Sequence, residues 1–212
     1  MEILIPAAHD YSVKFSEVHD PLLQEIHEYT IAHHPEAHMI SGPVQGQLLT
    51  MISQMIRPKR ILEIGTFTGY SALCLAKGLG EGGMLHTIEL READASIAAA
   101  FFEKTDLKHK ILLHTGDAHD ILTEIHEEWD LVLVDADKTG YIRYYEKLME
   151  KLKPNSWMIF DNVLFHGEVL KENITGKNAI AIHAFNDHVA KDDRIEKVLL
   201  TVRDGLMLIR KK

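Results

Sequence analysis

The feature that most constrains the fold of this sequence is a regular alternation of short apolar runs with helical segments, which begins at residue 60. Stretches with apolar residues at helical spacing separate the runs. Strands that alternate with helices of this length are typical of right-handed βαβ crossovers, which form a parallel sheet with helices on both faces. The sequence therefore predicts an α/β fold. The apolar runs cover residues 60–65, 84–90, 110–116, 130–136 and 156–162.

The C-terminal part predicts a change of strand direction. A further helix is expected near residues 177–191, and two apolar runs follow at 197–202 and 206–211. Asp204-Gly205 lies between these runs, and Asp-Gly between strands is a strong hairpin signal. We therefore expect a mostly parallel, seven-stranded Rossmann-like sheet with a C-terminal antiparallel hairpin.

Length and organisation favour one domain. The chain has 212 residues and shows no internal repeats or linkers rich in proline and glycine. We predict a single domain over residues 1–212, in which 1–40 form a helical extension whose best helix candidate is 21–34. In a later helical stretch, Met51 and Met55 are expected to pack in the core or against another subunit.

Charge and cysteine content limit the function classes. A formal net charge of −9 argues against broad electrostatic capture of nucleic acid or anionic membrane. No apolar run approaches the roughly 20 residues that span a bilayer, and the N-terminus lacks the pattern of a secretory signal. Cys74, the only cysteine, is expected in the core, and the histidines at 33, 34 and 38 in solvent or at helix ends. These features predict a cytoplasmic protein that does not bind membranes.

Three strand ends carry residues suited to an adenosyl cofactor. The segment EIGTFTGYS (63–71) follows a strand and opens a helix, and its glycines allow a tight turn, although its spacing is neither a dinucleotide fingerprint nor a P-loop. Glu89 ends the next strand and can accept hydrogen bonds from ribose hydroxyls, while the small residues of 116–118 leave room for adenine. A ligand-free turn and a solvated carboxylate are the alternatives. Together the signals favour S-adenosylmethionine, which has no pyrophosphate.

Acidic and amide side chains end the fourth and fifth apolar runs. Asp135 lies near the end of one run, and Asp161 and Asn162 close the other. Neighbouring parallel strands would bring the three side chains to one edge of the sheet. Such an all-oxygen set suits Mg²⁺, with Mn²⁺ or Ca²⁺ as alternatives, and does not suit zinc. The other interpretation is helix caps and solvated loop acids, with Lys138 as a counter-ion.

The combination of EIGTFTGYS, IEL, GDA, VDADK and DN resembles the cation-dependent caffeoyl-CoA and catechol O-methyltransferase family, in a short bacterial form, from about Ser41 to the C-terminus. The resemblance implies a class I methyltransferase fold, S-adenosylmethionine and a divalent metal as cofactors, and a homodimer. It implies that Asp135, Asp161 and Asn162 are the metal ligands and that Lys138, with Asp135, is catalytic. The cofactor contacts that it implies are Pro43, Glu63, Gly65, Thr66, Ser71, Glu89, Ala118 and Asp135.

The reaction that we predict is methyl transfer to a hydroxyl of a small catechol-like or phenolic acceptor. The metal would lower the pKa of the attacked hydroxyl, and Lys138 would take the proton, provided that its own pKa is depressed. The alternative is a tRNA hydroxyuridine O-methyltransferase, against which the net acidity counts. A nonenzymatic adenosyl-binding module is a third hypothesis, which the full set of ligands and Lys138 disfavours. A tRNA-binding face would depend on Lys171, Lys177, Lys191 and Arg194.

Overall fold

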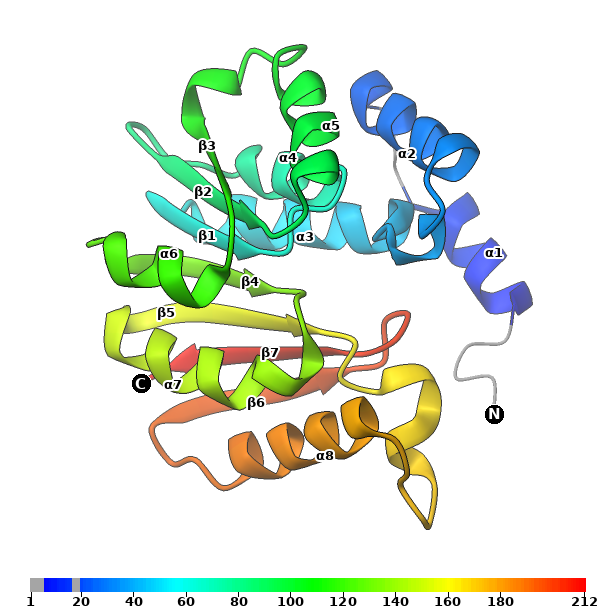
Figure 1. The fold of residues 1–212 in the computed structure, drawn as a ribbon, viewed down its shortest axis with the longest axis vertical. Coiled ribbons are helices and arrows are strands. Elements are labelled where there is room, and N and C mark those ends of the chain that lie inside the picture. The colour runs from blue at the N-terminus through cyan, green and yellow to red at the C-terminus, as the bar shows by residue number, and fades with distance from the viewer. Residues whose placement is uncertain (1–5, 17–19) are drawn as a thin grey trace. The chain divides into compact units, whose positions relative to one another are not determined.

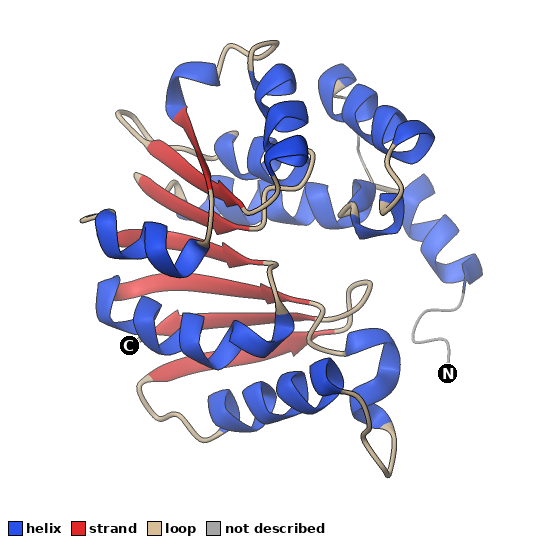
Figure 2. Cartoon of the chain, in the orientation of Figure 1, coloured by secondary structure: helices blue, strands red, loops and turns tan. Residues whose placement is uncertain are grey.

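The computed structural model describes residues 6–16 and 20–212. Its strands are ordered β3-β2-β1-β4-β5-β7-β6, and helices alternate with them along the chain (Figures 1 and 2). The strands are β1 (Arg60–Ile64), β2 (Met84–Glu89), β3 (Ile111–Thr115), β4 (Trp129–Val134), β5 (Leu152–Asp161), β6 (Ile195–Leu200) and β7 (Leu206–Lys211). The predicted fold class is confirmed. Strand β2 pairs in parallel with both β1 and β3, β4 pairs in parallel with β5, and β6 and β7 form an antiparallel hairpin.

Helices cover most of the remaining chain. In the described ranges, none is long and apolar enough to cross a lipid bilayer. The α-helices are α1 (Pro6–Lys14), α2 (Pro21–His33), α3 (Gly42–Ile56), α4 (Tyr70–Ala76), α5 (Glu92–Phe102), α6 (Ala118–Glu124), α7 (Tyr141–Lys151) and α8 (Lys177–Ala190). Short 3₁₀ helices are η1 (Ala37–Met39), η2 (Lys108–Lys110), η3 (Lys138–Gly140) and η4 (Phe165–Leu170).

Residues 7–126 form one compact unit. Strand β2 lies between β1 and β3 in parallel register, so that Leu85 pairs with Ile61 on one side and with Ile111 on the other. Nearly all of β1 and β2 is buried, as expected for parallel strands that are covered on both faces. Helix α4 is buried along its whole length, and Cys74 on it is fully enclosed, as predicted.

Residues 127–212 form a second compact unit, and the single-domain prediction for 1–212 stays a prediction. Strands β5, β7 and β6 lie side by side in it (Figure 1). Buried aromatic rings from α7, β5 and α8 make its core: Phe160 is 4.5 Å from Phe185 and 5.2 Å from Tyr141, measured between ring centroids. These contacts hold the helices on the sheet and therefore position the ends of β4 and β5.

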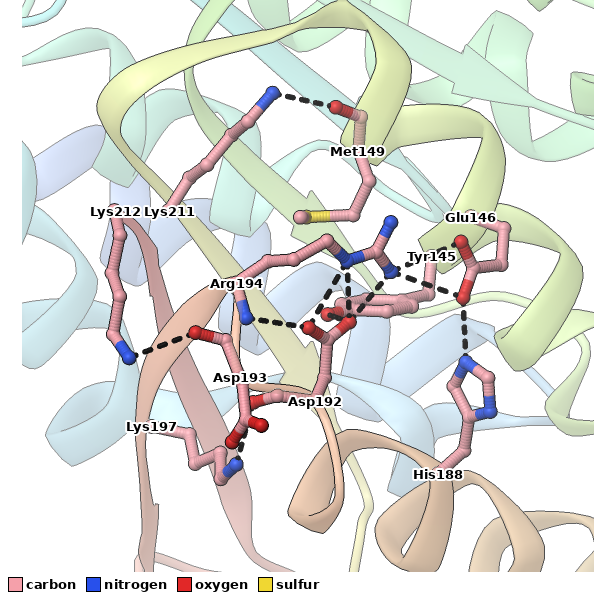
Figure 3. A network of polar contacts seen from close by, with 10 residues as sticks. All are labelled: Tyr145, Glu146, Met149, His188, Asp192, Asp193, Arg194, Lys197, Lys211 and Lys212. Atoms are coloured by element: carbon pink, nitrogen blue, oxygen red, sulfur yellow. Dashed lines mark hydrogen bonds and ion pairs between the residues drawn. The ribbon is translucent and has the colours of Figure 1, made fainter.

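A polar network joins α7, the end of α8 and the start of β6 (Figure 3). Arg194 donates to Asp192 at 2.6 Å and lies 3.2 Å from Glu146. The hydroxyl of Tyr145 also donates to Asp192, at 2.7 Å, and His188 lies 2.6 Å from Glu146. The hydrogen bonds from Arg194 hold the pKa of Asp192 well below its usual range. The network therefore stabilises the packing of this unit through charge-assisted bonds.

One prediction about helix α3 is wrong in part. The side chains of Met51 and Met55 are 49% and 74% exposed, so neither packs in the core of this chain. The buried face of the helix instead includes Gly46, Leu49 and Ser53, and a Cβ at Gly46 would lie 2.5 Å from the ring of Tyr70. Close packing against α4 thus selects small residues and turns the methionines outward. Their contact with another subunit stays a prediction.

The boundaries of the C-terminal strands also differ from the prediction. Strand β5 begins at Leu152, directly after α7, and not at residue 156. Its pairing with β4 shifts register, because Trp129 pairs with Leu152 and Leu131 with Trp157. A bulge therefore absorbs the extra residues. The hairpin of β6 and β7 is confirmed, although its connection spans residues 201–205 and is longer than a two-residue turn.

Candidate functional site

The loop between β1 and α4 is the first part of the candidate cofactor site. Gly65 and Gly69 have positive φ values of 102° and 90°, and Phe67 between them has a φ of 50°. A Cβ at Gly69 would also lie 2.7 Å from the ring of Phe102. The left-handed backbone and the close packing both require glycine there. The sequence EIGTFTGYS therefore forms the tight strand-to-helix turn that was predicted.

Glu63, in strand β1 just before this loop, has a fully buried side chain. Thr87 donates a hydrogen bond of 2.5 Å to Glu63, and its hydroxyl is 2.5 Å from that of Thr66. Thr87 thus connects the carboxylate of Glu63 to Thr66 of the loop. A buried carboxylate is costly unless donors or a positive charge compensate it, so this position suits the cationic part of a ligand.

Glu89 ends β2 and is almost fully buried. The backbone N–H of Phe67 donates to its Oε2 at 2.7 Å, and the backbone N–H of Arg91 donates to its Oε1 at 3.0 Å. A carboxylate can accept about four hydrogen bonds, so both oxygens keep capacity for further donors. Glu89 therefore joins the β1–α4 loop and can still accept two hydroxyl groups of a ligand.

Three other predicted cofactor residues lie in the first turns of three helices of the same unit. Ser71 is buried in the first turn of α4. Ala118 begins α6, where the side chain of Asp117 caps the helix by accepting from the N–H of His119 at 2.7 Å. Pro43 is half-buried in the first turn of α3. Described hydrogen bonds connect Glu63, Thr66 and Glu89 to the loop or its neighbours, and the cofactor roles of all these residues stay predictions.

The candidate metal ligands follow paired strands. Val134 and Phe160 are partners in the parallel register of β4 and β5, and Asp135 and Asp161 are the next residue along each strand. The two carboxylates therefore start from neighbouring positions at one edge of the sheet. Asp161 is buried, and Asn162 after it turns the chain with a φ of 58°. Two carboxylates and an amide oxygen are hard donors that fit a divalent cation such as Mg²⁺.

Lys138 contacts this cluster. Its ammonium donates to Oδ1 of Asp135 at 2.7 Å and to the hydroxyl of Tyr141 at 2.9 Å. Burial lowers the pKa of Lys138, but the Asp135 carboxylate and Tyr141 outweigh burial and raise the pKa above its ordinary range. The described structure therefore pairs Lys138 with Asp135, and the two roles that the sequence left open, base and counter-ion, stay predictions.

Sequence reasoning missed the contacts that Tyr141 makes at the candidate site. Its hydroxyl donates to the backbone oxygen of Asp161 at 2.8 Å while it accepts from Lys138, so it links the two strand ends. The spacing of three residues between Lys138 and Tyr141, at a helix start, was the available signal, because such residues lie on the same face.

Asp204 was also missed, since it was interpreted only as a hairpin residue. Its Oδ2 accepts from Nδ2 of Asn162 at 3.2 Å, and its Oδ1 accepts from the N–H of His166 at 2.5 Å. Only the amide nitrogen can donate to a carboxylate, so the amide oxygen of Asn162 is directed away from Asp204. Asp204 therefore orients the candidate ligand.

Histidine and cysteine do not add a second candidate centre. Among the residues that the structure describes, no group of three or more His, Cys, Asp or Glu side chains could hold a metal ion. The candidate set at the ends of β4 and β5 contains two carboxylates and the amide of Asn162, so it is not a group of three such side chains. From the histidine-rich segment, His34 contacts Asp94 at 2.9 Å.

Known proteins resemble this chain over nearly its whole length. The family model described as O-methyltransferase matches residues 12–212. A probable caffeoyl-CoA O-methyltransferase 2 of Dictyostelium discoideum is 31% identical over 208 residues, which cover 95% of this chain and 90% of that protein. Tapetum-specific methyltransferase 1 of Arabidopsis thaliana is 34% identical over 200 residues, which cover 90% of this chain and 86% of that protein.

A solved structure gives the same result. The O-methyltransferase from Bacillus cereus, in complex with SAH, has a TM-score of 0.89 and 31% identity, and the match covers 97% of each chain. Family model, relatives and structure agree over nearly the whole length. The chain therefore belongs to the O-methyltransferase family, and caffeoyl-CoA O-methyltransferases are among its relatives.

Proposed function

We propose that this O-methyltransferase takes its methyl group from S-adenosylmethionine and transfers it to a hydroxyl of a catechol-like or phenolic small molecule, with the help of a divalent cation. The observation that carries the proposal is the parallel pairing of β4 and β5, which starts Asp135 and Asp161 from adjacent positions. Asn162 follows directly, with its amide nitrogen held by Asp204.

The adenosyl cofactor is supported by charge and hydrogen bonding in the unit of residues 7–126. The buried carboxylate of Glu63 suits the positive charge of the methionine part of the cofactor. Glu89 retains acceptor capacity for the two ribose hydroxyls. The similar Bacillus cereus enzyme was solved with SAH, which is the product that S-adenosylmethionine leaves after methyl transfer.

The metal requirement is supported by the chemistry of the donors. Asp135, Asp161 and Asn162 offer only oxygen, which hard divalent cations prefer. When bound, such a cation lowers the pKa of a coordinated hydroxyl and orients it. Lys138 is proposed to accept the hydroxyl proton at its Nζ. Because its ion pair with Asp135 keeps Lys138 protonated, this role requires a change in the charge around Asp135.

A small phenolic acceptor is favoured over tRNA. Several relatives are named caffeoyl-CoA O-methyltransferases, and the caffeoyl group in that name is a phenol with two neighbouring hydroxyls. Three of the four residues on which a basic face would depend are paired with acids: Lys171 with Glu168 at 2.6 Å, Arg194 with Asp192 at 2.6 Å, and Lys191 with an aspartate on its own helix. These pairs reduce the positive field that would attract a phosphate backbone.

The test is a transfer assay with radiolabelled S-adenosylmethionine. Acceptors are caffeoyl-CoA, simple catechols, matched monophenols without the second hydroxyl, and tRNA that lacks the methyl group, each with Mg²⁺ or with EDTA. The variants are Asp161→Ala and, as a matched control, Asp137→Asn, which alters the neighbouring acid that accepts from the hydroxyl of Tyr144.

We expect transfer to catechols that EDTA abolishes and that the control variant retains. Asp161→Ala should reduce transfer by about a hundredfold or more, because even loss of a residue that only orients a metal ligand costs about 10–100-fold. Transfer that persists in EDTA would refute the metal requirement. If the methyl group is transferred to tRNA and to none of the phenols, the substrate is tRNA and the phenolic proposal is wrong. If none of the tested acceptors becomes labelled, the proposal of a phenolic acceptor is also contradicted.

A further inference from the structure

His34 follows helix α2 and uses both ring nitrogens. Its Nδ1 accepts a hydrogen bond of 3.0 Å from the backbone N–H of Glu36, so the ring proton lies on Nε2, which donates to Oδ1 of Asp94 at 2.9 Å. The side chains of His34 and Asp94 are only 9% and 5% exposed. Neighbouring His33, in contrast, is exposed. A buried bond to a carboxylate across 60 residues of sequence thus fixes the orientation of the His34 ring.

Asp94 extends this contact to Glu89, the residue proposed to bind the ribose. Oδ2 of Asp94 lies 2.6 Å from Nη2 of Arg91. The backbone N–H of Arg91 donates to Oε1 of Glu89, and its Nε lies 3.6 Å from the same oxygen. One oxygen of Glu89 is therefore connected to His34 through Arg91 and Asp94.

The other oxygen of Glu89 is connected to His34 through Phe67. The ring of Phe67 is in edge contact with the ring of His34, with centroids 4.5 Å apart, and the Arg91 guanidinium lies 5.6 Å from the ring of Phe67. The backbone N–H of Phe67 donates to Oε2 of Glu89, and Phe67 has a positive φ, which L-residues adopt only when their surroundings hold them.

Helix α2 contacts the same loop a second time. The hydroxyls of Thr30 and Thr68 lie 2.9 Å apart, within hydrogen-bond distance, and both residues are fully buried. Thr30 and His34 are four residues apart and lie on one side of the helix end. The chain segment that precedes the alternating strands and helices is therefore attached to the cofactor loop at two adjacent positions.

We propose that His34 is a positioning residue for cofactor binding: through Asp94 and Phe67 it holds the backbone and side-chain groups that orient the carboxylate of Glu89. The inference rests on the proposed use of S-adenosylmethionine. It assigns to residues 21–40, where the sequence indicated only a helix, a role in setting the affinity for the adenosyl group. Because His34 does not touch the reacting atoms, the rate at saturating cofactor should not depend on it.

The experiment measures the Kd for SAH by isothermal titration calorimetry on the full chain. His34→Asn leaves an amide that is too short to reach Asp94, whereas His34→Gln places an amide N–H near the position of Nε2. We expect about a tenfold higher Kd for His34→Asn, since the lost bond involves a charged partner. His34→Gln should raise the Kd by clearly less, because it restores the bond to Asp94 and loses only the ring contact with Phe67. The KM for S-adenosylmethionine should follow the Kd, with kcat unchanged. His33→Asn is the matched control on the exposed neighbour.

Several outcomes would overturn the inference. If wild type binds SAH and His34→Asn binds it equally well, His34 does not position the site, whereas the proposed cofactor stands. Equal weakening in the Asn and Gln variants, with lower melting temperatures in both, would show a purely structural role. If His34→Asn does not fold, Phe67→Leu must raise the Kd instead, and an unchanged Kd refutes the inference. A wild-type protein that does not bind SAH refutes the proposed cofactor together with this inference.

Discussion

Asp204→Ala tests whether the β6–β7 turn orients a metal ligand. The Asp204 carboxylate, which is 15% exposed, accepts from the side chain of Asn162 and from the backbone of His166. The loop that it holds contains Asn162, Phe165, His166 and Gly167, all with positive φ. Such residues cost on the order of 1 kcal/mol each when they are not glycine, so the loop needs external contacts to keep its conformation.

The expected magnitude follows from these bonds. The substitution removes two bonds to a charged acceptor, each worth about 1.5–3 kcal/mol when fully buried. Partial exposure lets water replace part of this energy, and the backbone oxygen of Asp204 still accepts from Leu164 at 2.9 Å. We therefore expect a loss of about 2 kcal/mol in the free energy of unfolding. Free rotation of the Asn162 amide should also weaken metal binding by about tenfold, the lower end for loss of a group that orients a ligand.

The assay is a Mn²⁺ titration followed by electron paramagnetic resonance, with circular dichroism melts on the same samples. Asp187→Ala is the matched control, because it removes an equal charge from an exposed site on α8 where Asp187 pairs with Lys191. Asp204→Asn should lie between wild type and Asp204→Ala, since one amide oxygen can replace only one of the two acceptors. Equal Mn²⁺ affinity in folded Asp204→Ala and in wild type would refute the assigned orientation of Asn162.

Three further predictions concern stability and reactivity. Hydrogen bonds from Arg194 depress the pKa of Asp192 in the folded state, so the stability from this pair is fully present above the ordinary carboxyl pKa of about 3.9 and declines as pH falls from there toward the lower folded-state pKa. In urea titrations Asp192→Asn should therefore destabilise most at pH 7, less at pH 3, and least at the lowest pH at which the protein stays folded. Gly69→Ala should lower the free energy of unfolding by about 1–3 kcal/mol, because the new Cβ meets Phe102 and the φ is left-handed; an unchanged melting temperature would contradict this. Burial raises the pKa of Cys74 to about 12, so its thiol should react with an aromatic disulfide reagent at pH 8 only after denaturation.

The order of elements could be predicted from the sequence because its signal is local. Apolar runs and helical spacing depend on residues that are near one another in the chain, and they predicted β1 to β4 within one or two residues. The same pattern showed that Asp135 and Asp161 end neighbouring strands, since parallel strands place their ends at one edge. The start of β5 was predicted less well, because a bulge in its pairing with β4 is a property of two strands together.

The partners of the site residues were decided only by tertiary structure. Asp204 orients Asn162 from a turn 42 residues away, and His34 reaches Asp94 across 60 residues, distances at which no spacing pattern exists. Lys138 could have been a base or a counter-ion from its position in the sequence, and the folded surroundings pair it with Asp135. Sequence periodicity therefore determined which elements form and which strand ends carry polar groups. Packing determined which donor faces which acceptor, because these contacts arise only when separate elements meet.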